Sequence, residues 1–226
     1  MLERQGRPCG GRPRRRRSIT VASSKGSAKK STKSTEASSG LPAYTVPSLT
    51  LDEGAQTAQI LQARLHALID LALTLKHIHW NVIGPHFIAV HEMIDPQVDA
   101  VQAMVDETAE RIATLGSVPV GTPGAIVASR TWDDYSIGRA STIAHLGALD
   151  EVYRGFITDH REAATATEEL DDVTNDMLIG QLGSLEQFHW FVRAHLESTS
   201  GELSTSDART EKGAARSAEA DAKGRA

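Results

Sequence analysis

Residues 77–115 read HIHWNVIGPHFIAVHEMIDPQVDAVQAMVDETAERIATL. Apolar residues recur every three or four positions on both sides of a Gly-Pro pair, which predicts two helices joined by a short break. Among its four histidines and six acidic residues, five have spacings that suit a metal site, and imidazole and carboxylate are ligand types that suit iron. These five candidate metal ligands are His79, His91, Asp95, Asp106 and Glu110.

The spacing of these side chains predicts a site shared between two subunits. An α-helix turns about 100° and rises about 1.5 Å per residue, so His91 and Asp95 lie one turn apart, and so do Asp106 and Glu110. The two pairs are separated by about 16 Å along the helix axis, so no single ion reaches both. An antiparallel copy of the helix would bring the first pair of one chain against the second pair of the other. His79 would add an imidazole from the preceding helix.

The chain divides into three predicted segments. Residues 1–40 hold eleven lysines and arginines against two acids, a net charge of +9, with almost nothing to bury, and should form a disordered basic tail. Residues 41–197 hold eight basic and twenty-two acidic residues, a net charge of -14, and show four long helical patterns. A long connection between the second and third helices indicates a ferritin-like four-helix bundle. Residues 198–226 are polar and are expected to be flexible.

The composition excludes several classes of protein. The chain of 226 residues has one cysteine, Cys9, and 4% aromatic residues, which argues against a disulfide framework and favours a reducing compartment, the cytoplasm. No apolar run approaches the roughly 18 residues of a membrane span, so no membrane partner is expected. For any one acid or histidine a solvated helix face is the alternative to a ligand, but the full set of five argues against chance.

The sequence resembles the Dps family (DNA protection during starvation), which is related to ferritin. The segments that carry the resemblance are HIHWNVIGPHFIAVHEMIDP, DETAERIATLG, TWDDY and DDVTNDML. The resemblance implies an all-α bundle that assembles as a homododecamer into a hollow shell. It also implies a ferroxidase, an enzyme that oxidises Fe(II), preferentially with hydrogen peroxide, and stores ferric oxyhydroxide. Iron would sit in di-iron centres at the two-fold interfaces, with Asp106 and Glu110 from one subunit and the other three ligands from its partner.

Two further groups of residues remain open to more than one interpretation. Asp172 and Asp176 are one turn apart at the start of the fourth helix, where the family has three-fold pores that admit iron; helix capping is the alternative. Glu186 and His189 match the Glu-x-x-His motif of classical ferritins, but the second helix lacks the matching histidine. A polar helix face is therefore the preferred interpretation of His189.

The basic tail predicts a nucleic-acid partner. Many members of the family bind double-stranded DNA without sequence preference, and a multivalent basic tail would do so by releasing counterions. A solubilising tail is the alternative. A mis-assigned start, with the protein beginning near Val21, would leave a net charge of +3. The whole chain is thus interpreted as a ferroxidase that protects DNA at the nucleoid; the alternative is a structural nucleoid-condensing protein with an incidental metal site.

Overall fold

The computed structural model describes residues 42–224, which form helices and one short pair of parallel strands. In chain order the elements are α1 (Leu51–Asn81), β1 (Val82–Ile83), α2 (Phe87–Thr114), α3 (Pro123–Ser129), β2 (Ala140–Ser141), α4 (Thr142–Thr167), α5 (Asp172–Leu196) and α6 (Glu211–Gly224). Within residues 42–224, no helix has both the length and the apolarity that a membrane span requires. The predicted basic tail lies outside the described residues.

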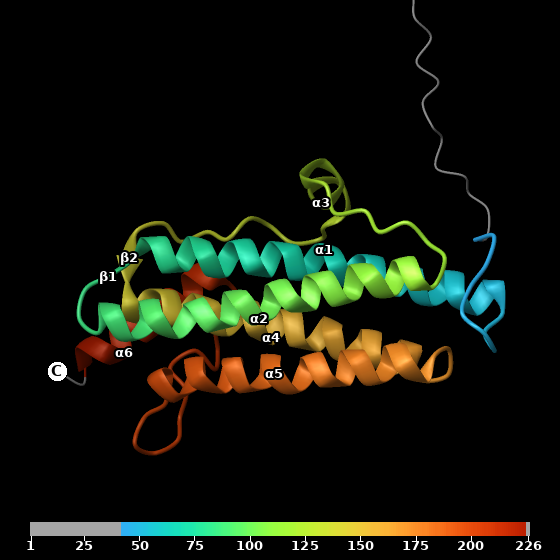
Figure 1. Ribbon diagram of the computed structural model, residues 1–226. Helices are drawn as coiled ribbons and strands as arrows, with labels where there is room; N and C mark the ends of the chain where they lie inside the picture. Colours follow the sequence, from blue (N-terminus) through green and yellow to red (C-terminus); the bar gives the residue numbers. More distant parts are fainter. Residues whose placement is uncertain (1–41, 225–226) are drawn as a thin grey trace, which may run out of the picture. The chain divides into compact units, whose positions relative to one another are not determined.

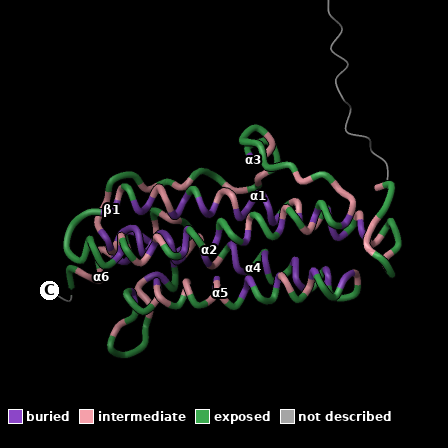
Figure 2. Tube along the Cα trace, viewed as in Figure 1, coloured by how far each residue is buried: buried purple, intermediate pink, exposed green. Residues whose placement is uncertain are grey.

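Four long helices, α1, α2, α4 and α5, form the predicted bundle (Figure 1). Helix α1 packs mainly against α2, and α4 packs mainly against α5. Their buried sides face inward (Figure 2), and on α1 the buried residues include Leu61, Leu65, Leu68 and Leu75. This spacing of three, four and seven positions gives one apolar stripe, which a helix must bury against its neighbours. The all-α class and the long crossover between the second and third long helices are confirmed.

The crossover between α2 and α4 runs along α1 (Figure 1), where side-chain hydrogen bonds hold it. The indole Nε1 of Trp132 donates to the Asp70 carboxylate at 2.8 Å, and the His66 imidazole Nε2 donates to the Val120 carbonyl at 2.8 Å. At the end of the crossover β2 pairs in parallel with β1, so that Val82 lies opposite Ala140. These contacts hold a segment that is poor in regular structure at a defined place on the bundle.

The C-terminal segment differs from the expected flexible tail. Helix α6 packs on α4 and buries Ala214, Ala215 and Ala218, while the Glu211 carboxylate accepts hydrogen bonds from the backbone and hydroxyl of Ser136. The expectation rested on mean polarity, which is high because the outer face of α6 carries mainly charged and polar residues. A stripe of three alanines is nevertheless enough to dock a helix closely when the partner helix offers a glycine.

Gly147 of α4 provides that close approach, and Gly147→Ala is expected to loosen α6. A Cβ at this position would lie 2.7 Å from the Ala214 carbonyl oxygen and 2.9 Å from the Ala218 Cβ, so α6 must shift. Hydrogen exchange of the backbone amides in residues 211–224 should therefore become faster. Gly180→Ala is the matched control, because this glycine is also inside a helix and a Cβ there meets nothing within 4 Å. Unchanged protection of α6 in Gly147→Ala would contradict the close docking.

Candidate metal centre

The turn between α1 and α2 brings His79 and His91 together. His79 lies in the last turn of α1 and His91 in the first turns of α2, joined by β1 and by His86 in the left-handed conformation at φ 63°. The two rings stack with their centroids 3.6 Å apart. Two histidines that are twelve positions apart in the sequence are therefore in direct contact in the structure.

Each of these rings is oriented by the backbone of the other histidine. His79 Nδ1 lies 3.1 Å from the His91 carbonyl oxygen, and His91 Nδ1 lies 3.0 Å from the His79 carbonyl oxygen. A carbonyl can only accept, so both Nδ1 atoms carry the proton and both Nε2 atoms carry a free lone pair when the rings are neutral. Metal-binding histidines in proteins are held by this kind of hydrogen bond at the nitrogen that does not bind the metal.

Asp95 joins the two histidines and is kept ionised. Its Oδ1 accepts a hydrogen bond from Lys76 Nζ at 2.6 Å and lies 3.1 Å from His79 Nδ1. The hydrogen bond from Lys76 lowers the pKa of Asp95; partial desolvation opposes the shift, and His79 and His91 add to it. The predicted ligands His79, His91 and Asp95 thus form one cluster, which we call the imidazole cluster. Lys76 was not anticipated from the sequence, although its position three residues before His79 puts it on the same helix face.

Asp106 and Glu110 lie apart from the imidazole cluster. Both are exposed on α2, one turn from each other. Helix geometry separates Asp106 from Asp95 by about 16 Å. In the described part of a single chain, no group of three or more histidine, cysteine, aspartate or glutamate side chains is placed to hold a metal ion. In one chain the five predicted ligands therefore fall into two separate groups, the imidazole cluster and this carboxylate pair.

Large apolar side chains are exposed on the two helices that carry the imidazole cluster. Leu73 of α1 is 64% exposed, Trp80 is 70% exposed, and Ile88 of α2 is 58% exposed. Trp80 therefore does not pack in the core of this chain. Large exposed apolar side chains beside polar ligands are characteristic of surfaces that another protein chain covers.

At the start of α5, the acidic residue at the N-cap position is a different one from the two exposed acids that the sequence singled out. Asp171 occupies the N-cap position and is buried, where its Oδ2 accepts hydrogen bonds from the Arg111 guanidinium at 2.5 Å and from the Thr174 hydroxyl. Asp172 and Asp176 both point to the exposed surface. The N-cap position therefore belongs to Asp171, which the sequence did not single out and whose side chain binds Arg111 and Thr174 instead of capping the helix. The pore interpretation of Asp172 and Asp176 remains a prediction.

The Glu-x-x-His motif of α5 does not form a metal site within the described residues. His189 Nε2 lies 2.7 Å from the Asp150 carboxylate of α4, whose other oxygen accepts a hydrogen bond from the buried Thr205 hydroxyl. Glu186 pairs instead with Arg161. His189 thus connects α5, α4 and the C-terminal segment, as expected of a structural polar residue rather than a ligand.

Comparisons with known proteins agree with the ferritin-like fold. Residues 58–201 match the ferritin-like domain family. The chain is 55% identical over 175 residues to the DNA protection during starvation protein of Mycolicibacterium smegmatis, which covers 77% of this chain and 96% of that protein. Among solved structures, Mycobacterium smegmatis Dps is 56% identical with a TM-score of 0.74, covering 76% of this chain and 98% of the other. DpsA14 from Streptomyces coelicolor is 62% identical with a TM-score of 0.71, covering 72% and 97%.

Proposed function

Because the chain belongs to the Dps family of ferritin-like proteins, we propose that it is a ferroxidase that oxidises Fe(II) with hydrogen peroxide and stores the ferric product. The substrate site would form at a two-fold interface between subunits. The imidazole cluster of one subunit would face the Asp106 and Glu110 carboxylates of the other. Because the contact is two-fold, each dimer would contain two such sites. Twelve subunits would form the shell.

The observation that carries this proposal is the orientation of the two histidine rings. Both Nδ1 atoms are held by backbone carbonyls, which leaves both Nε2 atoms available to bind Fe(II). Two imidazoles with carboxylates form a ligand set of intermediate softness that binds Fe(II). The incomplete ligand set of one chain and the exposed apolar residues beside it support completion by a second copy.

The proposed reaction uses two irons and one peroxide. Each Fe(II) loses one electron, the O–O bond of hydrogen peroxide accepts both electrons and breaks, and the two oxygens leave as hydroxide or water. Two Fe(II) ions held together deliver the electrons as a pair, so no hydroxyl radical is released. Lys76 and the backbone carbonyls hold Asp95 and the rings in place while the iron substrate enters and leaves.

Stopped-flow measurement of Fe(II) oxidation tests the proposal directly. The purified oligomer is mixed with Fe(II) and then with peroxide or with oxygen. We expect a fast phase with peroxide that saturates near two irons per subunit, and a slower one with oxygen. Rates no faster than those in buffer would overturn the ferroxidase proposal and leave the nucleoid-condensing alternative.

Asp172 and Asp176 are proposed to attract Fe(II) to the shell. Both carboxylates are exposed at the start of α5, and neither serves as the N-cap. Three copies around a three-fold axis would create a negative field that concentrates cations at a pore. The proposed pore position is supported by membership of the family and by the exposure of both carboxylates.

Binding to DNA is proposed to occur through the basic tail, residues 1–40, in the cytoplasm at the nucleoid. Twelve tails of charge +9 would bind many phosphates at once, and the bundle, with its net negative charge, would repel DNA. Deletion of residues 1–40 is expected to abolish the electrophoretic shift of double-stranded DNA and to leave Fe(II) oxidation unchanged.

The tail experiment has an internal control. Deletion of residues 1–20 alone leaves four lysines against Glu36, a net charge of +3, and should weaken the shift and its dependence on salt without removing it. An undiminished shift after deletion of residues 1–40 would show that another surface binds DNA. Loss of the shift together with loss of Fe(II) oxidation would indicate a failure of assembly instead.

A further inference from the structure

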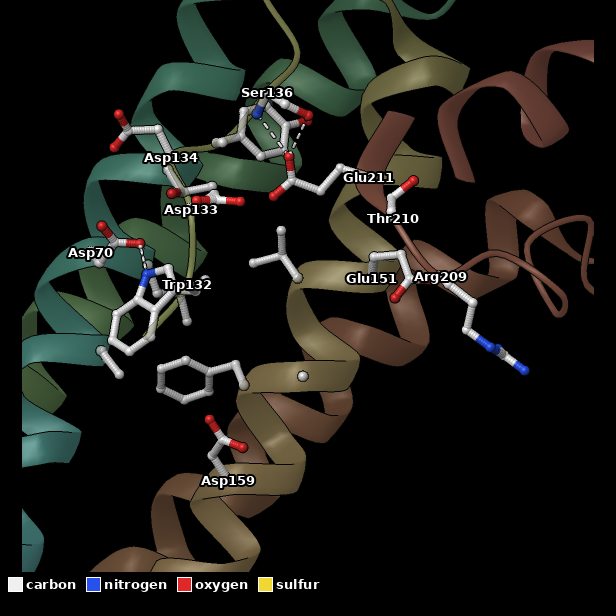
Figure 3. Close-up of a pocket in the computed structure, with 17 residues that line it drawn as sticks. Asp70, Trp132, Asp133, Asp134, Ser136, Glu151, Asp159, Arg209, Thr210 and Glu211 are labelled. Atoms are coloured by element: carbon white, nitrogen blue, oxygen red, sulfur yellow. Dashed lines mark hydrogen bonds between the residues drawn. The ribbon is translucent and has the colours of Figure 1, made fainter. Parts of the chain in front are cut away.

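A cavity lies between α1, the crossover, α4 and the residues that lead into α6, and nothing proposed above uses it (Figure 3). Its volume is about 410 Å³, within the range of sites that hold small molecules. Its walls are apolar, formed mainly by Leu71, Trp132, Val152 and Phe156. The Trp132 ring is fixed, because its Nε1 donates to the Asp70 carboxylate at 2.8 Å.

The charge around this cavity is strongly negative. Six of the residues that line it are acidic, and Arg209 is the single basic one among them. Figure 3 shows the Arg209 side chain pointing away from the cavity. Aromatic faces beside carboxylates favour ammonium groups, both by direct charge and by attraction to the ring. The cavity therefore selects for a cation with an apolar body.

Some of these acids are neutralised by neighbouring arginines, which shows where the remaining charge lies. Arg130 pairs with Asp70 and Asp134, and Arg154 pairs with Glu151. By contrast, none of the ion pairs found among residues 42–224 involves Asp133 or Glu211. Glu211 accepts only the two neutral hydrogen bonds from Ser136.

The remaining charge lies at two separate ends of the cavity. Asp133 and Glu211 are at one end, and Asp159 is at the other (Figure 3). The Asp159 carboxylate is more than half exposed and lies 3.8 Å from Arg64, so it is only partly compensated. On the α4 wall of the cavity, Glu151 and Asp159 are eight positions apart, about 12 Å along the helix axis. Two acidic ends with an apolar wall between them match a linear molecule with an amine at each end.

We propose that this cavity binds a linear aliphatic polyamine. One terminal ammonium would lie between Asp133 and Glu211, the other beside Asp159, and the methylene chain would pack against Trp132, Val152 and Phe156. The length of the α4 wall, about 12 Å from Glu151 to Asp159, suits an extended triamine such as spermidine better than a short diamine. The proposal is independent of iron oxidation, because it shares no residue with the imidazole cluster or with the carboxylate pair of α2.

Isothermal titration calorimetry of the full-length oligomer with spermidine tests the proposal. Asp133→Asn and Asp159→Asn are each expected to weaken spermidine binding by about tenfold, because each removes one charge-assisted contact. Glu168→Gln and Glu169→Gln remove the same charge from exposed residues that do not line this cavity, and should leave the affinity unchanged. Spermidine should also change the tryptophan fluorescence of the parent protein and of a Trp80→Phe variant, but not that of Trp132→Phe.

A second comparison tests whether both ends matter. Diaminooctane, with an amine at each end, should bind much more tightly than octylamine, which has the same chain and one amine. Equal affinity of the two would overturn two-ended recognition. Equal losses in the cavity variants and in the Glu168 and Glu169 controls would reduce the binding to general attraction by an acidic surface, and absence of heat in the parent protein would overturn the proposal outright.

Discussion

Replacing Asp106 and Glu110 together with alanine is expected to abolish the rapid phase of Fe(II) oxidation. These two carboxylates form the half of the proposed ligand set that faces the imidazole cluster of the partner subunit. Both are exposed in the single chain, so their loss leaves no buried charge and no cavity. Loss of a residue that only hydrogen-bonds to a metal ligand typically lowers metal affinity or activity by 10- to about 100-fold. Loss of two residues that bind the metal directly should have a larger effect.

The measurement is stopped-flow oxidation with peroxide, alongside the mass of the assembled oligomer. Asp99→Ala is the control, because it removes an exposed carboxylate from the same helix at a position outside the proposed ligand set. The double variant should still shift DNA, which separates the ferroxidase from the nucleoid-condensing alternative. Oxidation at the parental rate would mean that the ligand set is wrong.

Asp171→Ala is expected to destabilise the fold by about 3 kcal/mol, because removing one partner of a buried ion pair leaves the other charge uncompensated. The Arg111 side chain is 14% exposed and that of Asp171 is 6% exposed, so water cannot replace the lost carboxylate. The substitution also removes the acceptor of the Thr174 hydroxyl at the start of α5. Asp172→Ala is the matched control, one residue away and exposed, and should cost far less.

The pH dependence of this ion pair has a definite sign. Burial disfavours the charged form of Asp171, but hydrogen bonds from Thr174 and Arg111 outweigh it and lower the pKa. A lowered folded pKa means that the ionised pair stabilises the fold above the unfolded pKa of about 4, and that this contribution is lost as the pH falls toward the folded pKa. Calorimetric midpoints of parent and Asp171→Ala, at one protein concentration, should therefore converge as the pH falls below 4. A constant difference down to strongly acidic pH would contradict the ion pair.

The sequence was sufficient to predict the bundle because its helices are long and amphipathic. Residues such as Leu61, Leu65 and Leu68 repeat at helical spacing and form an apolar stripe. Such a stripe is stable when it is buried against other helices. Helix ends were less predictable. The first helix is capped by Thr50 in a capping box with Glu53, and the neighbouring Asp52 is also a residue type that caps helices, so the sequence alone does not single out the cap.

The docking of α6 could not be predicted from composition. Its contact with α4 depends on Ala214 and Ala218 meeting Gly147, and the match between small residues far apart in sequence is invisible to a local pattern. The segment is polar on average because most of the residues on its outer face are polar. Mean polarity and one-sided burial are different properties, and only the second determines whether a short helix packs.

The candidate ligands could be chosen from residue type and spacing, but their local geometry could not. The contact between His79 and His91 depends on the turn that contains His86 at positive φ, a backbone conformation that sequence alone does not specify for a histidine. The pairing of Lys76 with Asp95 likewise requires α1 and α2 to pack at one particular register. The assignment of the five ligands as a group remains a prediction that the variants above test.

The reciprocal hydrogen bonds between His79 and His91 also bear on how quickly the site could be used again. Two rings that were free to rotate would lose rotamer entropy each time a metal ion bound, and would have to be ordered afresh after each ion departed. Here folding itself orders the rings, since each is held by a main-chain carbonyl that no reaction step consumes. In the proposed site the two rings would therefore already have their binding orientation before an ion arrives, and repeated cycles would be timed by the movement of ions rather than by the protein.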